Sequence, residues 1–326
     1  MAILWKEDRS LQASWKCIPS ASRGGSRKEN SFSTHSTPTS AGSGLMPSGW
    51  LSEARREFHA TILNGILTKT AQGIPSNADK GSRPSIEIAT DILSQLGPCR
   101  TAEKLPGQTS GADFETACAA FVRLCFEKMS HLRPGDFSVI KGGGIAQYDQ
   151  YSHLDELEAI ARTNKEIATA LGSDYLIKPD VLISRRPETD EAINAGNYLV
   201  DDQSAHLTSL RLHNQTSSIL HASISCKWTL RSDRAQNARS EGLNLVRNRK
   251  GRLPHIAVIT GEPTPNRIAS LALGTGDIDC VYHFALDELR NALIGQQRDD
   301  TLELLMMMIE GKRLRDISDL PLDLVT

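Results

Sequence analysis

The chain has 326 residues, long enough for one large domain or two ordinary ones with a sizeable core and no need for disulfide bonds. Its 37 Lys and Arg nearly balance its 39 Asp and Glu, so the net charge does not indicate a nucleic-acid partner and any basic surface must be local. Its 6 cysteines form no C-x-x-C pair, which argues against a zinc site and suits reduced thiols in a cytoplasm. No apolar run approaches the roughly 20 residues that span a bilayer, and no apolar signal opens the chain, so we expect neither membrane insertion nor secretion.

The first part of the chain has the composition of a flexible segment. Residues 17–49 are rich in Ser, Thr, Gly and Pro and contain few residues that build a core. Met46 stands just before the first periodic segment. Two interpretations are therefore open: residues 1–45 are a disordered extension, or translation begins at Met46. In both, we expect one domain over residues 46–326.

Apolar residues at helical spacing predict a series of helices in the first half of this domain. We expect helices over 51–66 and 85–96, a turn-like stretch over 73–85 between them, and a helix over 153–171. Another helix carries an apolar stripe that we interpret as core packing; the stripe consists of Phe114, Ala117, Cys118, Phe121, Leu124 and Cys125.

The second half of the domain alternates predicted strands with helices. Strands are expected over 175–184, interrupted at Pro179, and over 219–228, 254–260 and 278–286. Helices are expected over 234–247, 286–293 and 301–311. This order predicts an α/β fold with a central mixed sheet flanked by helices.

Charged residues gather around the strand over 219–228. Strand alternation places Ser223, Ser225 and Lys227 on one face, away from the apolar positions. On the following helix, Glu241 falls on the inward apolar stripe, where it needs a cationic or metal partner. Asp180 would supply the second carboxylate that a hard cation such as Mg²⁺ requires. This set fits metal-assisted phosphodiester hydrolysis, but taken alone these residues are explained more simply by a structural salt bridge at a sheet edge.

The motifs around these residues resemble a known enzyme superfamily. Pro-Asp at 179–180, Ser-Cys-Lys at 225–227 and a glutamate on the next helix resemble the permuted active site of PD-(D/E)XK restriction endonucleases. Longer stretches resemble the NgoMIV type of type II restriction endonuclease, from about residue 46 to the end of the chain; they read LPGQTSG, LGSDY, SISCKWTLRSDRAQNARSEGLNLVRNRKGRLPHI, ALGTGDIDCVYHFAL and GKRLRDISDLPLDL.

The resemblance implies a catalytic set. Asp180 and Glu241 would hold Mg²⁺, with two ions per active site, and Lys227 would act on the attacking water. Ser225 takes the place of the acid usual elsewhere in the superfamily. Glu115 is similar to an additional acidic residue near the metal site.

The resemblance also implies a DNA-reading set. Arg231, Asp233 and Arg234 would read a central CCGG, which suits the chemistry, because arginine donates to guanine O6 and N7 and aspartate accepts from cytosine N4. Gln108 would approach the minor groove. Asp79 and Arg267 would address the outer base pair, although the loop around Asp79 departs slightly from the family pattern.

The implied function is a type II restriction endonuclease that cuts GCCGGC after the first G and leaves 5′ CCGG overhangs with 5′ phosphates. The family forms homotetramers that hold two DNA copies, and a methyltransferase modifies the same site. A two-fold dimer reading a palindrome is also what symmetry requires. The alternatives are a sequence-specific DNA-binding protein without cleavage and a structural α/β domain with surface ion pairs.

Other features carry simpler interpretations. Gly142–Gly144 lacks a nucleotide-loop register and predicts a flexible turn. His221, on the same predicted strand face as Lys227, is expected to be packed or hydrogen-bonded. The basic run Arg247, Arg249, Lys250 and Arg252 is either a solvated helix end or a phosphate-contacting surface.

Overall fold

The computed structural model describes residues 48–101, 107–171, 177–274 and 276–326, without the side chains of residues 107, 108 and 171. These residues belong to one compact unit, Pro47–Thr326. The predicted extension over 1–45 lies outside the described residues. No helix among the described segments is long and apolar enough to cross a membrane.

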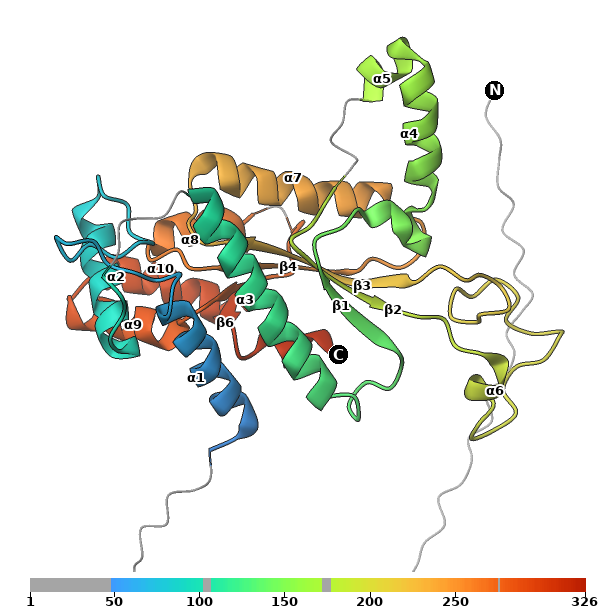
Figure 1. The fold of residues 1–326 in the computed structure, drawn as a ribbon, viewed down its shortest axis with the longest axis horizontal. Helices are drawn as coiled ribbons and strands as arrows, with labels where there is room; N and C mark the ends of the chain where they lie inside the picture. Colours follow the sequence, from blue (N-terminus) through green and yellow to red (C-terminus); the bar gives the residue numbers. More distant parts are fainter. Residues whose placement is uncertain (1–47, 102–106, 172–176, 275) are drawn as a thin grey trace, which may run out of the picture. The chain divides into compact units, whose positions relative to one another are not determined.

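A six-stranded sheet in the order β1-β2-β3-β4-β5-β6 forms the centre of the unit (Figure 1). β2 is antiparallel to both of its neighbours, β1 and β3, and β3 to β6 run parallel to one another. The sheet is therefore mixed, as predicted. The strands are β1 (Phe137–Lys141), β2 (Val181–Arg185), β3 (Ile219–Lys227), β4 (His255–Thr260), β5 (Cys280–His283) and β6 (Leu314–Asp316).

Helices cover both faces of the sheet. One face packs against α3, which in turn packs against α1, while α7 crosses the opposite face (Figure 1). The helices are α1 (Trp50–Leu63), α2 (Arg83–Leu96), α3 (Gly107–Lys128), α4 (His153–Thr163), α5 (Lys165–Leu171), α6 (Asp190–Ile193), α7 (Ser232–Asn248), α8 (Pro265–Ala272), α9 (Leu286–Gly295), α10 (Asp299–Glu310) and α11 (Leu320–Leu324), with short 3₁₀ turns η1 (Ile145–Gln147) and η2 (Asp149–Tyr151).

The predicted alternation of β3 holds in its second half and positions the site. Cys226 and the following Trp228 face α3, where Trp228 meets the ring of Phe114 at 4.9 Å between centroids. Ser225 faces α7 and donates to Glu241. Both faces of β3 are buried, so Ser225 and Lys227 point into a covered polar layer and not toward open solvent.

The prediction that His221 lies on the same face of β3 as Lys227 was wrong. The pairing of β2 with β3 shifts at His221, since Ile183 pairs with Ala222 and the next residue of β2 pairs with Leu220. This irregularity turns His221 toward Phe126 of α3, away from the face of Lys227. Its expected hydrogen bond is present: Nε2 lies 2.6 Å from the carbonyl of Leu324.

Several predicted boundaries changed. The helix expected over 153–171 breaks at Asn164, whose Oδ1 accepts from the amides of Glu166 and Ile167 and begins a second helix. The strand expected over 175–184 begins only at Val181, because residues 177–180 are irregular and residues 175 and 176 lie outside the described part. The strand expected over 278–286 is shorter, ending at His283 before α9 begins.

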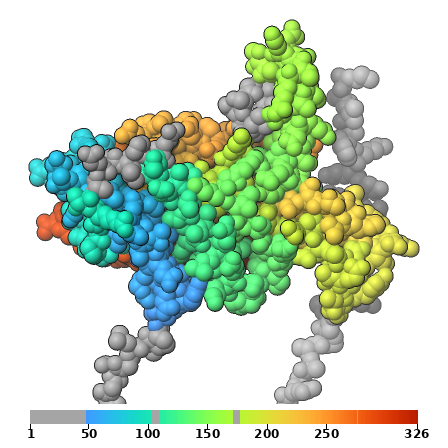
Figure 2. Space-filling view, in the orientation of Figure 1, coloured from blue at the N-terminus to red at the C-terminus, as the bar shows by residue number. Residues whose placement is uncertain are grey.

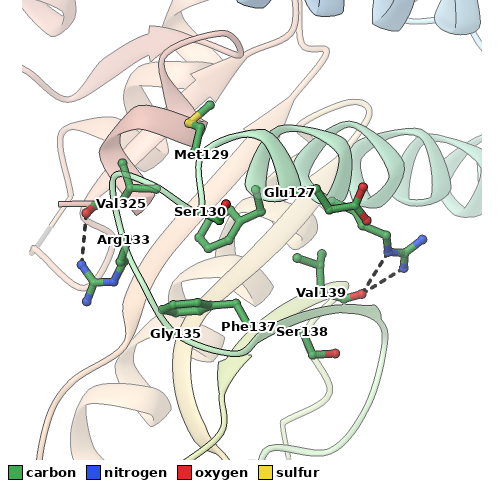
Figure 3. Close-up of a pocket in the computed structure, with 11 residues that line it drawn as sticks. Glu127, Met129, Ser130, Arg133, Gly135, Phe137, Ser138, Val139 and Val325 are labelled. Carbon is green, nitrogen blue, oxygen red and sulfur yellow. Dashed lines mark hydrogen bonds between the residues drawn. The ribbon is translucent and has the colours of Figure 1, made fainter. Parts of the chain in front are cut away.

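Two segments stand out from the surface in Figure 2: α4 with α5, and the stretch around α6. A separate cavity of about 290 Å³ lies between the end of α3 and the start of β1, lined by Arg133 and Phe137 among others (Figure 3). Phe137 pairs with Arg185, the last residue of β2, whereas Asp180 precedes Val181 at the other end of that strand. This cavity is therefore distant from the carboxylates that flank Lys227.

Candidate active site and DNA-reading groove

The end of β3 brings Asp180 and Lys227 together. Asp180 directly precedes β2, and the antiparallel pairing of Val181 with Ile224 places it beside the last residues of β3. Its Oδ2 accepts from the amide of Cys226 at 2.7 Å and from Nζ of Lys227 at 3.0 Å. The proximity expected from the sequence is confirmed.

Lys227 keeps its charge in this environment. Its side chain is 15% exposed, and burial alone would lower the pKa. The negative charges of Glu241 and Asp180 outweigh that effect and raise the pKa above its ordinary value. The group is therefore an ammonium that donates hydrogen bonds and carries positive charge.

Glu241 reaches the same place from α7. Its Oε2 accepts from Ser225 Oγ at 2.8 Å, and burial raises its pKa, an effect that Lys227 and Ser225 partly offset. The neighbouring Gly242 lets α7 pack closely against the backbone before β5, because a Cβ there would lie 2.7 Å from the carbonyl oxygen of Asp277.

Glu115 lies on α3 at the edge of this group. Burial and the negative charge of Asp180 raise its pKa above the ordinary value, and the positive charges of Lys141 and Lys227 offset only part of this rise. Lys141, at the end of β1, lies 3.6 Å from its carboxylate. Five charged side chains thus influence one another at this edge of the sheet: Glu115, Lys141, Asp180, Lys227 and Glu241.

These residues suit a hard cation only in part. Among the described residues, no group of three or more His, Cys, Asp and Glu side chains is arranged to hold a metal ion. Hydrogen bonds within the described part engage one oxygen of each carboxylate, Oδ2 of Asp180 and Oε2 of Glu241. The second oxygen of each remains for a cation, whose other ligands would be water and phosphate oxygens.

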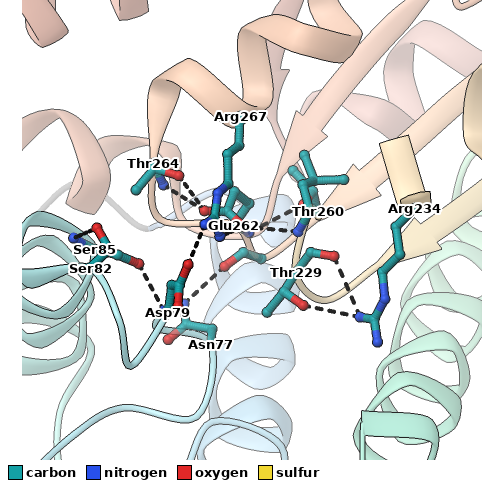
Figure 4. A network of polar contacts seen from close by, with 12 residues as sticks. Asn77, Asp79, Ser82, Ser85, Thr229, Arg234, Thr260, Glu262, Thr264 and Arg267 are labelled. Carbon is teal, nitrogen blue, oxygen red and sulfur yellow. Dashed lines mark hydrogen bonds and ion pairs between the residues drawn. The ribbon is translucent and has the colours of Figure 1, made fainter. Parts of the chain in front are cut away.

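A groove of about 490 Å³ opens beside this site. It is lined by Asp79, by Arg231 and other residues at the start of α7, and by Arg267 of α8. Arg267 forms an ion pair with Asp79, and this contact lowers the pKa of Asp79 (Figure 4). Three residues of the predicted DNA-reading set therefore lie around one concave surface.

The other predicted DNA-reading residues are placed as follows. Asp233 is exposed in the first turn of α7. Arg234, one residue further, donates to Thr229 Oγ1 at 3.0 Å and is held against the preceding loop (Figure 4). Gln108 belongs to the first turn of α3, but its side chain lies outside the described residues.

Two features of this region were not anticipated. Glu262, after β4, is completely buried and lies between the two halves of the groove. Its only sequence signal is an acid two residues after a buried strand. The end of the basic run, in contrast, lies away from the site: Lys250 and Arg252 follow the end of α7 at Asn248, and His255 after them pairs with Ala222 near the start of β3.

Comparisons with known proteins agree on one family. A family model described as NgoMIV restriction enzyme matches residues 58–326. The type II restriction enzyme NgoMIV of Neisseria gonorrhoeae is 55% identical over 278 residues, which cover 83% of this chain and 97% of that enzyme.

Two solved structures share a weaker likeness. The type IIF restriction endonuclease Bse634I with cognate DNA has 16% identity and a TM-score of 0.34, and the match covers 74% of this chain and 91% of that one. The PspGI restriction endonuclease with substrate DNA has 14% identity and a TM-score of 0.22, with 84% and 90% covered. These scores are too low for a comparison of individual residues.

Proposed function

Because the chain belongs to the NgoMIV family of type II restriction enzymes, we propose that it cleaves both strands of duplex DNA at a CCGG-centred palindrome in a Mg²⁺-dependent reaction. The observation that carries this proposal is the convergence of Asp180, Lys227 and Glu241 at the end of β3. A salt bridge alone would not require the buried glutamate as well.

Asp180 and Glu241 are the residues that would hold Mg²⁺, each with the oxygen that hydrogen bonds leave available. When bound, Mg²⁺ lowers the pKa of a coordinated water and stabilises the charge that develops on the phosphate. Ser225 fixes the glutamate by donating to Oε2. Glu115, whose pKa is raised by burial and by the negative charge of Asp180, would face the same site from α3 and would support the second of two ions.

Lys227 acts in this proposal as a charged donor. Its raised pKa keeps it protonated, so it orients the attacking water and the scissile phosphate and offsets the negative charge of the transition state. Its bond to Asp180 Oδ2 holds the ammonium beside the carboxylate that positions the cation.

The DNA-reading groove would give the specificity. Arg231, Asp233 and Arg234 suit a central CCGG, because their donors and acceptor match the major-groove edges of G and C. Arg267 and Asp79 would read the outer base pair, giving GCCGGC, and Gln108 would approach the minor groove. Cleavage after the first G would leave 5′ CCGG overhangs with 5′ phosphates.

We further propose that the enzyme is cytoplasmic, that two chains read the palindrome as a dimer, and that dimers pair into a homotetramer holding two DNA copies. Support for self-association comes from the protruding segment after α6, which exposes large apolar residues: Tyr198 is 79% exposed, Leu199 64% and Leu207 97%. A methyltransferase that modifies the same site would protect the host DNA.

Digestion of a plasmid of known sequence tests the proposal. Run-off sequencing of the ends made in Mg²⁺ reports the site and the cut position, and a gel shift in Ca²⁺ reports binding without cleavage. We expect cuts only at GCCGGC. Binding in Ca²⁺ with intact plasmid in Mg²⁺ would instead identify a DNA-binding protein without cleavage, and the absence of both would leave a structural domain.

A further inference from the structure

A buried carboxylate occupies the turn that follows β4. Glu262 is 0% exposed, and burial raises its pKa. A carboxylate in this position is costly unless donors surround it. Its Oε2 accepts from the amide of Leu230 at 2.8 Å, and its Oε1 accepts from the amide of Thr264 at 3.2 Å and from the Thr264 hydroxyl.

The partners of Glu262 belong to two different walls of the DNA-reading groove. Leu230 precedes Arg231, the N-cap of α7, so the bond to its amide fixes the start of that wall. On the other wall, the guanidinium of Arg267 lies 3.7 Å from Oε2 of Glu262 and forms its ion pair with Asp79 (Figure 4). One carboxylate thus sets the spacing between Arg231 and Arg267.

The same turn also contacts the catalytic strand. Thr260 Oγ1 donates to the carbonyl of Lys227 at 2.8 Å, and Asn77 donates to the carbonyl of Gly261 at 2.9 Å. Gly261 has no room for a side chain, because a Cβ would lie 2.3 Å from the ring of Trp228. The turn is therefore tightly packed, and a change at Glu262 cannot be absorbed by movement of its backbone.

We propose that Glu262 is a positioning residue for sequence recognition, which holds Arg231 and Arg267 at the spacing needed to read the inner and outer base pairs together. This inference rests on the proposed function of those arginines. Glu262 lies beneath the groove and touches neither the phosphate nor the bases in this proposal, so its contribution is to discrimination between sites.

The donors around Glu262 make an amide a poor replacement. The N–H groups of Leu230 and Thr264 donate, the Arg267 guanidinium adds a positive charge, and only the Thr264 hydroxyl can also accept. A glutamine NH₂ would face a backbone N–H in either orientation of the amide. Glu262→Gln, although equal in size, should therefore displace one wall of the groove.

The test is the ratio of kcat/KM for GCCGGC to that for a duplex with a substituted outer pair, ACCGGT. For Glu262→Gln we expect this ratio to fall about tenfold to a hundredfold relative to the unmodified enzyme, the discrimination carried by a base-reading arginine. Thr264→Val, which removes only the hydroxyl donor, should lower the ratio less but in the same direction. Glu303→Gln, an exposed glutamate of α10, is the matched control.

A merely structural role would lower the melting temperature and the cleavage of both duplexes equally. An unchanged ratio in folded Glu262→Gln overturns the inference while leaving the restriction activity intact. If that variant does not fold, an unchanged ratio in Thr264→Val overturns it. An unmodified enzyme that does not prefer GCCGGC contradicts the proposed function itself and removes the premise of the inference.

Discussion

The ammonium of Lys227 lies 3.0 Å from Oδ2 of Asp180, although the two residues are 47 positions apart. The same oxygen accepts from the amide of Cys226, so the backbone of β3 fixes the carboxylate as well. A flexible surface salt bridge contributes little to stability. Here the pair is largely buried and held by a strand, an arrangement that keeps charge in place for chemistry.

Replacement of Lys227 separates binding from cleavage. Lys227→Met removes the ammonium but keeps most of the apolar stem, so cleavage of a GCCGGC duplex in Mg²⁺ should fall by about 10³-fold or more. Binding in Ca²⁺ should remain within a few-fold, because Lys227 is not part of the DNA-reading groove. Lys178→Met, an exposed lysine close to Asp180, is the control and should cleave normally. Equal loss of binding and cleavage in Lys227→Met would argue against a role in the chemical step.

The raised pKa of Glu241 predicts a pH-dependent demand for Mg²⁺. A carboxylate must be ionised to hold the cation, so protons compete with Mg²⁺ at a pH above the usual value for glutamate. At limiting Mg²⁺, cleavage should decrease as the pH falls through that raised pKa, and excess Mg²⁺ should move the midpoint to lower pH. Initial rates across pH at two Mg²⁺ concentrations measure this shift.

Two variants test whether Glu241 causes this Mg²⁺-dependent shift. Glu241→Gln should abolish the Mg²⁺-dependent shift together with most activity. Ser225→Ala removes one hydrogen bond to the carboxylate and should cost only a few-fold. A midpoint that does not depend on the Mg²⁺ concentration would exclude Glu241 as the titrating ligand.

The grouping of Asp180, Lys227 and Glu241 could be predicted from the sequence because a small number of local rules determines it. Strand alternation places Ser225 and Lys227 on one face, and helical spacing turns Glu241 inward. Once β2 pairs with β3, Asp180 has to lie near the end of β3. The mixed sheet and α7 followed from the same patterns.

The parts that the sequence did not predict depend on long-range contacts. β1 and β6 are short and of mixed composition, so their strand conformation comes from pairing with β2 and β5. The register shift that turns His221 is invisible in an alternating sequence. Glu262 follows β4 in a Gly-Glu-Pro sequence, which is typical of a solvent-exposed turn. Only the surrounding N–H groups explain its burial.

The position of Lys250 and Arg252 leads to a test of the two interpretations of the basic run. Lys250 and Arg252 lie beyond α7, near the start of β3, and the nine residues of β3 separate them from Lys227 by roughly 26 Å at about 3.3 Å per residue. A short duplex centred on the active site should not depend on them. Lys250→Ala with Arg252→Ala should leave kcat/KM on a 12-base-pair duplex and its salt dependence nearly unchanged, whereas Arg231→Ala should lower it strongly. A shallower salt slope in the double variant would instead identify phosphate contacts.

Arg55 of α1 joins two carboxylates from the last part of the chain, and this cluster should make the stability of the protein depend on pH. Its guanidinium donates to both oxygens of Glu288 and of Asp316, at 2.7–2.9 Å, with all three side chains largely buried. Burial alone would raise the pKa of Asp316 and Glu288, but Arg55 lowers both. Groups with lowered pKa contribute stability above their unfolded pKa, near 4, and lose it as the pH falls through the lower folded value.

Replacement of Arg55 should therefore matter most at neutral pH. Arg55→Met leaves two buried carboxylates without a cation and should lower the free energy of unfolding by about 3–5 kcal/mol at pH 7. The difference from the unmodified protein should shrink as the pH falls toward 4, because protonation removes the unpaired charges in the variant. Urea unfolding at pH 7, 5.5 and 4 measures this, and Arg83→Met, which breaks the exposed pair with Glu87, serves as the control with little expected change. A difference that stays constant with pH would mean that Arg55 stabilises the protein by packing and not through its two carboxylates.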